Sequence, residues 1–177
     1  MTIKTNRGLL AVATTAALML AIAGPASAST TAATVTVTGG ALSITAPANA
    51  GNIGSIADTV LGGTISGPLG QVQVNDARSA AAGSGWVATV ISTAFTPVSG
   101  PTIGAASVGY TAGPITKVGT ATFTANNPSD LTGAVAAVTA TGITGDNSAT
   151  WSPTINVAVA GGTIAGVYSG TITHSVS

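Results

Sequence analysis

Few side chains in this 177-residue chain could take part in acid–base chemistry. The chain has no glutamate and no cysteine, and its only acids are four aspartates, namely Asp58, Asp76, Asp130 and Asp146. Hydrolysis of a glycosidic bond usually needs two carboxylates held a few ångströms apart. Most of these aspartates instead stand in turn-like contexts, where Asp closes local backbone hydrogen bonds. We therefore predict turn positions rather than a catalytic pair.

The single histidine, His174, leaves a Ser-His-Asp triad open on residue counts alone, because serine is abundant. His174 shares the phase of a terminal strand-like run with Ile172 and Val176, however, which predicts a hydrogen-bonded, partly buried structural histidine. No group of residues has metal-ligand spacing, and Gly145-Asp146-Asn147-Ser148 would offer calcium one carboxylate. The sequence thus predicts a protein that is not an enzyme, with no cofactor and no metal.

The aromatic side chains are the remaining candidates for binding. Tryptophan and tyrosine combine a large flat face with a polar group, and such faces suit sugar rings, although a Trp is also prime core material in a chain so poor in large side chains. Pro153 places Trp151 near a sheet edge or a strand start, so we predict an exposed, functional Trp151 and a more structural Trp86. The candidate ligand-binding residues are Trp151, Trp86, Tyr110 and Tyr168.

The N-terminus predicts export. Lys4 and Arg7 precede an apolar stretch over 9–23, which Gly24-Pro25 and then Ala26-Ser27-Ala28 follow. This is the order of a secretory signal peptide with a small-x-small cleavage site, and the stretch is shorter than the roughly 20 apolar residues of a membrane span. We predict a signal peptide over 1–28 and a single mature domain over 29–177, secreted to the cell wall or cell surface.

Charge limits the partners of that mature chain. Two bases, Arg78 and Lys117, stand against four aspartates, so the net charge is near −2. Two bases cannot neutralise a row of phosphates, which excludes nucleic acid as a partner. The lack of a basic amphipathic helix argues equally against anionic membranes. A neutral surface, or another copy of the chain, fits this composition best.

Period-two alternation of Thr and Val with apolar residues predicts an all-β fold, an antiparallel β-sandwich or, alternatively, a barrel-like closure. We expect a hairpin at Gly39-Gly40, loops over 46–57 and 80–85, and a strand that begins at Trp86 and another at Trp151. The expected strands cover 34–38, 41–44, 71–75, 86–91, 120–125, 135–139, 155–159 and 168–176.

The chain also resembles the WxL domain family of Gram-positive cell-surface proteins. The resemblance rests on Pro68-Leu69-Gly70 followed by Val72-x-Val74-x-Asp76-x-Arg78, on Gly85-Trp86, and on Trp151-Ser152-Pro153 before Tyr168-Ser169-Gly170-Thr171-Ile172-Thr173. It covers about 34–176, although both Trp motifs lack the Leu two residues after Trp. It implies an all-β domain that binds peptidoglycan non-covalently, with Trp86 and Trp151 in the binding motifs.

Two functions follow as hypotheses. The first is a secreted, non-catalytic surface protein that associates non-covalently with cell-wall peptidoglycan. The alternative is a self-associating structural or adhesin-like surface subunit, because exposed, uncharged strand edges pair readily with one another.

Overall fold

The computed structural model describes residues 29–57 and 59–177. The predicted signal peptide and Asp58 lie outside these residues. A compact unit extends from Val37 to Ser177; it is the β domain considered below. In the described chain no helix is long and apolar enough to cross a membrane.

The β domain contains ten strands and one short 3₁₀ helix among its described residues. These are β1 (Leu42–Thr45), β2 (Gly63–Pro68), β3 (Val72–Ser92), β4 (Thr96–Pro97), η1 (Ala105–Ser107), β5 (Val108–Thr111), β6 (Ile115–Ala125), β7 (Val135–Trp151), β8 (Thr154–Val159), β9 (Tyr168–Ser169) and β10 (Ile172–Val176). The described strands pair antiparallel in three sheets. The largest has the order β1-β3-β7-β6, and β10 also pairs with β3. The second has the order β2-β8-β5, and the third consists of β4 and β9. The predicted all-β sandwich is confirmed, and the described strands do not close into a barrel.

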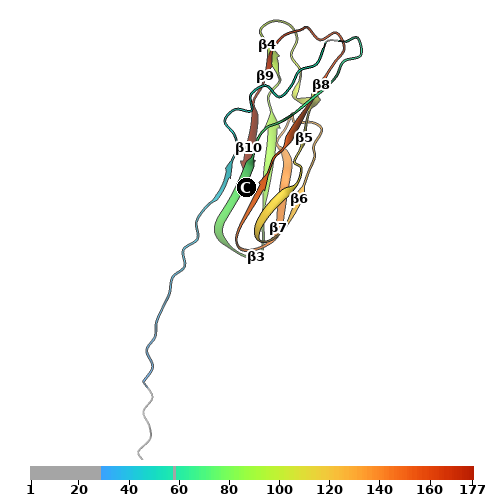
Figure 1. Ribbon diagram of the computed structural model, residues 1–177. Coiled ribbons are helices and arrows are strands. Elements are labelled where there is room, and N and C mark those ends of the chain that lie inside the picture. The colour runs from blue at the N-terminus through green and yellow to red at the C-terminus, as the bar shows by residue number, and fades with distance from the viewer. Residues whose placement is uncertain (1–28, 58) are drawn as a thin grey trace, which may run out of the picture. The chain divides into compact units, whose positions relative to one another are not determined.

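The long strands β3 and β7 contribute to both layers of this sandwich. Their register shifts repeatedly between Asp76 and Trp86, and such irregularities bend a strand. On one edge of β3, its first half pairs with β1 and its second half pairs with β10. Strand β6 has matching register shifts on either side of Thr120. The strands curve round together at the end of the domain opposite β4 and β9 (Figure 1).

The three-stranded sheet prolongs the layer that holds the first half of β3, at the end of that layer away from the bend. Strands β2, β8 and β5 precede or follow β3, β7 and β6 in the chain, and they keep the same lateral order. Pro68 is the last residue of β2, and the connections from β7 to β8 and from β5 to β6 contain Pro153 and Pro114. Prolines lack the N–H that a continuous ladder needs. The prolines therefore explain why one layer divides into two hydrogen-bonded sheets.

Alternation along the strands builds the core, as predicted. In β3 the buried positions are Val72, Val74 and Asp76 in the first half and Trp86, Ala88, Val90 and Ser92 in the second. In β8 the side chains of Ile155 and Val157 are buried. Ile172, His174 and Val176 of β10 share one half-buried face, while the residues between them are exposed.

Several expected boundaries are wrong. Residues 34–38 carry no strand and 39–40 no hairpin, because Gly40 donates to Ala77 O and the chain runs on beside β3 into β1. The expected loop over 80–85 is strand, since the Gly- and Ala-rich run pairs with β7 across the bend. Trp86 consequently lies inside β3, and Trp151 ends β7 rather than beginning a strand.

Candidate functional site

The two tryptophans are core residues, each with 2% of its surface exposed. The expectation that Trp151 is exposed is therefore wrong. Pro153 does interrupt a strand, but it does so inside the domain, where it too is fully buried. Neither indole ring offers a face to a ligand in this structure. Tyr110, with 1% exposure, is equally enclosed, so Tyr168 is the one candidate of the four that a ligand can reach.

Trp86 belongs to a hydrogen-bond network that joins the two layers. Its indole N–H donates to Asn147 Oδ1 at 2.9 Å, and Asn147 Nδ2 donates to Asp76 Oδ2 at 3.0 Å. Arg78 donates to the same carboxylate through Nε, at 2.8 Å to Oδ1, and through Nη2, at 3.0 Å to Oδ2. Arg78 Nη2 also donates to Gly85 O at 3.1 Å. The residues that carry the family resemblance in this region thus hold the bend of β3 together.

The charge at the centre of this network is fully buried. Asp76 has no exposed surface, whereas 36% of the Arg78 side chain is exposed. The bidentate bond from Arg78 holds the pKa of Asp76 below its usual value, although burial of the carboxyl opposes this shift. A buried carboxylate with four donors is ionised and satisfied, so it is a structural anchor rather than an acid or base facing a substrate.

Trp151 anchors a second network at the other Trp motif. Its indole N–H donates to the Tyr110 hydroxyl at 2.7 Å, and that hydroxyl lies 3.1 Å from His174 Nε2. Because an indole N–H can only donate, the Tyr110 proton is free to point at His174. We therefore assign the His174 proton to Nδ1, so that Nε2 accepts from the Tyr110 hydroxyl and the ring is neutral. The hydrogen-bonded, partly buried His174 expected from the sequence is confirmed.

Acid should therefore destabilise the domain through His174. Burial lowers the pKa of His174 below 6.5 and raises the pKa of Tyr110 to about 12. Below pH 6.5 the unfolded chain binds a proton that the folded chain does not, so the free energy of unfolding should fall as pH falls from 6.5 towards the folded pKa. One proton limits this slope to about 1.4 kcal/mol per pH unit.

Urea denaturation at pH 8, 6.5 and 5 measures this effect. The urea concentration at the unfolding midpoint should change little between pH 8 and 6.5 and should be lower at pH 5. In His174→Gln, whose amide oxygen can accept from Tyr110, the drop from pH 6.5 to 5 should be smaller. An equal drop in both proteins would contradict this assignment.

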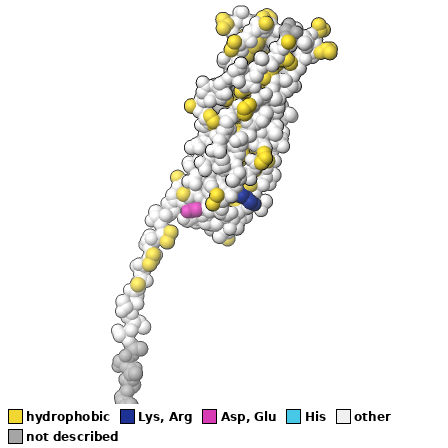
Figure 2. Space-filling view, in the orientation of Figure 1, with side chains coloured by type: hydrophobic (Ala, Val, Ile, Leu, Met, Phe, Trp, Pro, Cys, Tyr) yellow, Lys and Arg dark blue, Asp and Glu magenta, His cyan; other side chains and the backbone are white. Residues whose placement is uncertain are grey.

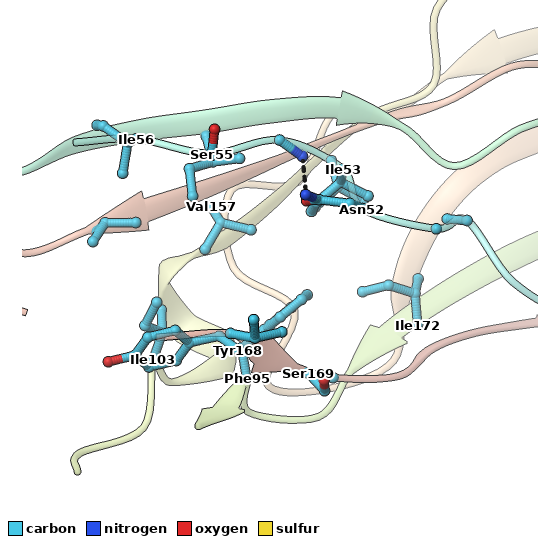
Figure 3. A pocket seen from close by; sticks show the side chains of 18 of the residues that line it. Asn52, Ile53, Ser55, Ile56, Phe95, Ile103, Val157, Tyr168, Ser169 and Ile172 are labelled. Atoms are coloured by element: carbon cyan, nitrogen blue, oxygen red, sulfur yellow. Dashed lines mark hydrogen bonds between the residues drawn. The ribbon is translucent and has the colours of Figure 1, made fainter. Parts of the chain in front are cut away.

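A cavity of about 770 Å³ lies at the end of the sandwich that carries β4 and β9. Ile65, Ile155 and Val157 line it from one layer, while Phe95 and Ile172 line it from the other side. Figure 3 shows Ile53 and Ile56 on one side, and Phe95, Ile103 and Tyr168 on the opposite side. The cavity is thus the open mouth between the two layers.

The lining is uncharged among the residues that the structure describes. It combines aliphatic side chains with two aromatic rings, Phe95 and Tyr168, both half-buried. Polar groups without charge, Asn49, Asn52 and Ser169 among them, add hydrogen-bonding capacity. The Tyr168 hydroxyl donates to Ile164 O at 2.8 Å, which fixes the direction of its ring. His174 reaches the same cavity, so the Trp151 network ends at its wall.

Exposed aliphatic side chains occur in the loops of this same end. Figure 2 shows hydrophobic side chains gathered there, with charged ones visible only near the opposite end on this face. Val98, Val60 and Leu61 are almost completely exposed, and Val167 and Ile164 are exposed to a smaller extent. Exposed apolar patches often mark interaction sites, so this end is the candidate binding surface.

The remaining aspartates form no site. Asp130 accepts from the backbone N–H and hydroxyl of Thr132, which confirms a turn and lowers its pKa. Asp146 lies within β7 and accepts from Ser79 N, and Asp76 lies within β3, so the turn expectation is wrong for these two. Within residues 29–57 and 59–177, no three His, Cys, Asp or Glu side chains group as a metal site.

Comparisons of the chain with protein-family models, with curated proteins and with solved structures found no match. The sequence did not indicate the cavity, because loops distant in the chain form its walls. The sequence did predict one part of the cavity wall as a loop, the segment over 46–57, and the structure confirms that this segment is a loop that lines the cavity.

Proposed function

We propose that this protein is an exported, non-catalytic cell-surface protein that associates with the cell wall and binds the uncharged glycan of peptidoglycan at the open end of its β-sandwich. The cavity at that end carries the proposal. It is large enough for a small ligand, its described lining lacks charge, and Tyr168 presents a partly accessible ring beside amide and hydroxyl groups.

The residues of the WxL-like motifs support the proposal as parts of the framework around the cavity, rather than as direct contacts to the ligand. Asp76, Arg78 and Trp86 fix the bend, and Trp151 positions Tyr110 and His174 behind the cavity. We assign the two tryptophans to the framework and the glycan contact to Tyr168 and Phe95. Wall association then rests on the cavity, together with the predicted export signal over 1–28.

Pull-down with purified wall sacculi tests this assignment. Tyr168→Ala should weaken binding about threefold to tenfold, the range expected when one aromatic contact is lost, while Tyr168→Phe should retain most of it. Thr124→Ala, on an exposed position of β6, is the matched control and should bind normally. Because few ion pairs can form, binding should change little between low and moderate salt. Steep salt dependence, or unchanged binding by Tyr168→Ala, would contradict the proposal.

A second candidate function is self-association as a surface subunit. The specific observation in its favour is the set of nearly fully exposed aliphatic side chains at the open end, above all Val60, Leu61 and Val98. Such side chains gain by burial against another protein surface. Concentration-dependent oligomers in the absence of sacculi distinguish this function from wall binding.

A further inference from the structure

The wall that β2 and β8 give to the cavity is wholly aliphatic. The two strands contribute Ile65, Ile155, Val157 and Val159, and Leu69 follows directly after β2. Each of these side chains ends in methyl groups, so this wall offers a ligand no side-chain donor or acceptor. A ligand that lies against it gains by burying apolar surface.

The segment over 46–57 continues this lining across the cavity-facing side of β2. A Cβ on Gly67 would overlap the backbone of Ile53, and a Cβ on Gly63 would overlap the Ile56 side chain. The two glycines therefore let the segment approach β2 closely, with no side chain of their own in between. Both isoleucines line the cavity (Figure 3), so the segment adds aliphatic surface to that of the sheet.

The polar side chains of the lining are largely engaged already. The lining hydroxyls that donate to nearby backbone carbonyl groups are those of Thr59, Thr163 and Tyr168. Asn52 Oδ1 accepts from Gly54 N at 3.0 Å, and His174 Nε2 is bonded to the Tyr110 hydroxyl. In the part of the chain that the structure describes, no buried side-chain nitrogen or oxygen lacks a partner. The depth of the cavity thus holds no buried polar side-chain atom that waits for a ligand.

No base lines the cavity among the described residues. Arg78 and Lys117, the two bases of the predicted mature chain, are both described and lie elsewhere. The sequence places one acid, Asp58, next to the lining residues Ala57 and Thr59, although Asp58 itself is outside the described residues. A carboxylate or phosphate head group would therefore find no cationic partner here, and leaving water without one is costly. An uncharged head group fits this site better.

Exposure of the aliphatic lining increases from the depth of the cavity to its mouth. Ile155 is fully buried, whereas Ile56 is 38%, Ile164 52% and Val167 79% exposed. All four side chains line the same cavity. A hydrocarbon chain that reaches into the cavity from solvent therefore has aliphatic side chains to pack against at every depth.

We propose that the depth of this cavity takes the single hydrocarbon chain of an uncharged amphiphile, whose hydroxylated head group lies at the mouth beside Tyr168 and the asparagine amides. The inference rests on the proposed function in taking this cavity as the binding site, and it adds an aliphatic part to the ligand. Protein interiors are close-packed, with few voids larger than a water molecule. A space of about 770 Å³ between aliphatic walls has the size of a small-ligand pocket, and hydrocarbon fills it most favourably.

Displacement of the neutral dye N-phenyl-1-naphthylamine by 1-monoacylglycerols, below their micelle concentrations, tests the proposal. The mature chain over 29–177 contains the whole compact unit and lacks the apolar stretch over 9–23, which would itself bind the dye. Each added methylene should tighten binding about fourfold, so the dodecanoyl ester should bind at least about tenfold more tightly than the decanoyl ester. Dodecanoate, which has the same chain and a charged head, should bind at least about tenfold more weakly than the dodecanoyl ester.

Variants that fill the cavity provide the structural test. Ile65→Trp and Ile103→Trp add a large ring from opposite walls, both at half-buried positions, and each should weaken binding of the dodecanoyl ester at least about tenfold. Val118→Trp adds the same ring at an exposed position of β6 outside the cavity and should bind like the wild type. Circular dichroism confirms that each variant retains the β fold.

Three results would each overturn the proposal: no saturable displacement of the dye, equal affinity for the two esters, or wild-type affinity in both filled variants. Purified sacculi carry no free lipid, so sacculus binding reports the glycan contact alone. Loss of ester binding with intact sacculus binding would reject this inference and leave the proposed function standing, and the opposite pair of results would reject the glycan contact alone.

Discussion

Trp151→Ala should lower the free energy of unfolding by about 3–5 kcal/mol, the usual cost of removing a large buried aromatic side chain. The indole has 2% of its surface exposed, and its N–H is bonded to a buried hydroxyl. The substitution leaves a cavity in the core and deprives Tyr110 of its donor. For a domain with a typical stability of about 5–15 kcal/mol, this is a large fraction. Urea denaturation at pH 8, followed by circular dichroism, measures it.

Trp86→Ala should have a cost in the same range, because Trp86 is equally buried and its N–H bonds to Asn147. Val118→Ala is the control, since 67% of Val118 is exposed and little should change. A Trp151→Ala protein that unfolds at the wild-type midpoint would contradict the buried position of this residue and restore it as a candidate for ligand contact.

The alternation of polar and apolar residues made the fold class predictable. Period-two patterns around Val72–Asp76, Trp86–Val90 and Ile155–Val159 are also the patterns of burial. A half-buried strand needs one apolar side chain in every two, so the pattern and the physical requirement coincide. The same phase argument placed His174 with Ile172 on the inner face of the last strand.

The bend was beyond the reach of local patterns. The glycine- and alanine-rich composition of 80–85 predicts a flexible loop, yet these small residues let β3 turn from one layer to the other while it remains paired with β7. The pairing partner lies more than 60 residues away in the chain, at Gly145 for Ala80. Only tertiary pairing distinguishes a bent strand from a loop of this composition.

The prediction that Trp151 is exposed was wrong for a related reason. Pro153 correctly indicated a break in the ladder, but a break need not lie at the surface. Here β7 ends at Trp151, and β8 resumes the same layer at Thr154, with the proline buried between them. The indole partner Tyr110 is 41 residues away, so the sequence near Trp151 could not show that its N–H is satisfied inside the domain.

Arg78→Ala should destabilise the domain by about 3 kcal/mol at pH 7, at the lower end of the cost of breaking a buried ion pair. The substitution leaves Asp76, which has no exposed surface, with only Asn147 and a backbone N–H as donors. The lower end applies because 36% of the Arg78 side chain is exposed, so part of the pair is already screened by water. Denaturation midpoints of variant and wild type measure the difference.

The dependence of this loss on pH identifies its cause. In the wild type, Arg78 depresses the pKa of Asp76 below 3.8, so the contribution of the pair is present above about pH 3.8 and is lost as pH falls through the folded pKa. In Arg78→Ala the carboxylate is buried without its partner, and protonation relieves it. The gap between variant and wild type should therefore narrow below about pH 4. A gap that stayed constant with pH would mean that Arg78 acts through packing of its side chain rather than through its charge.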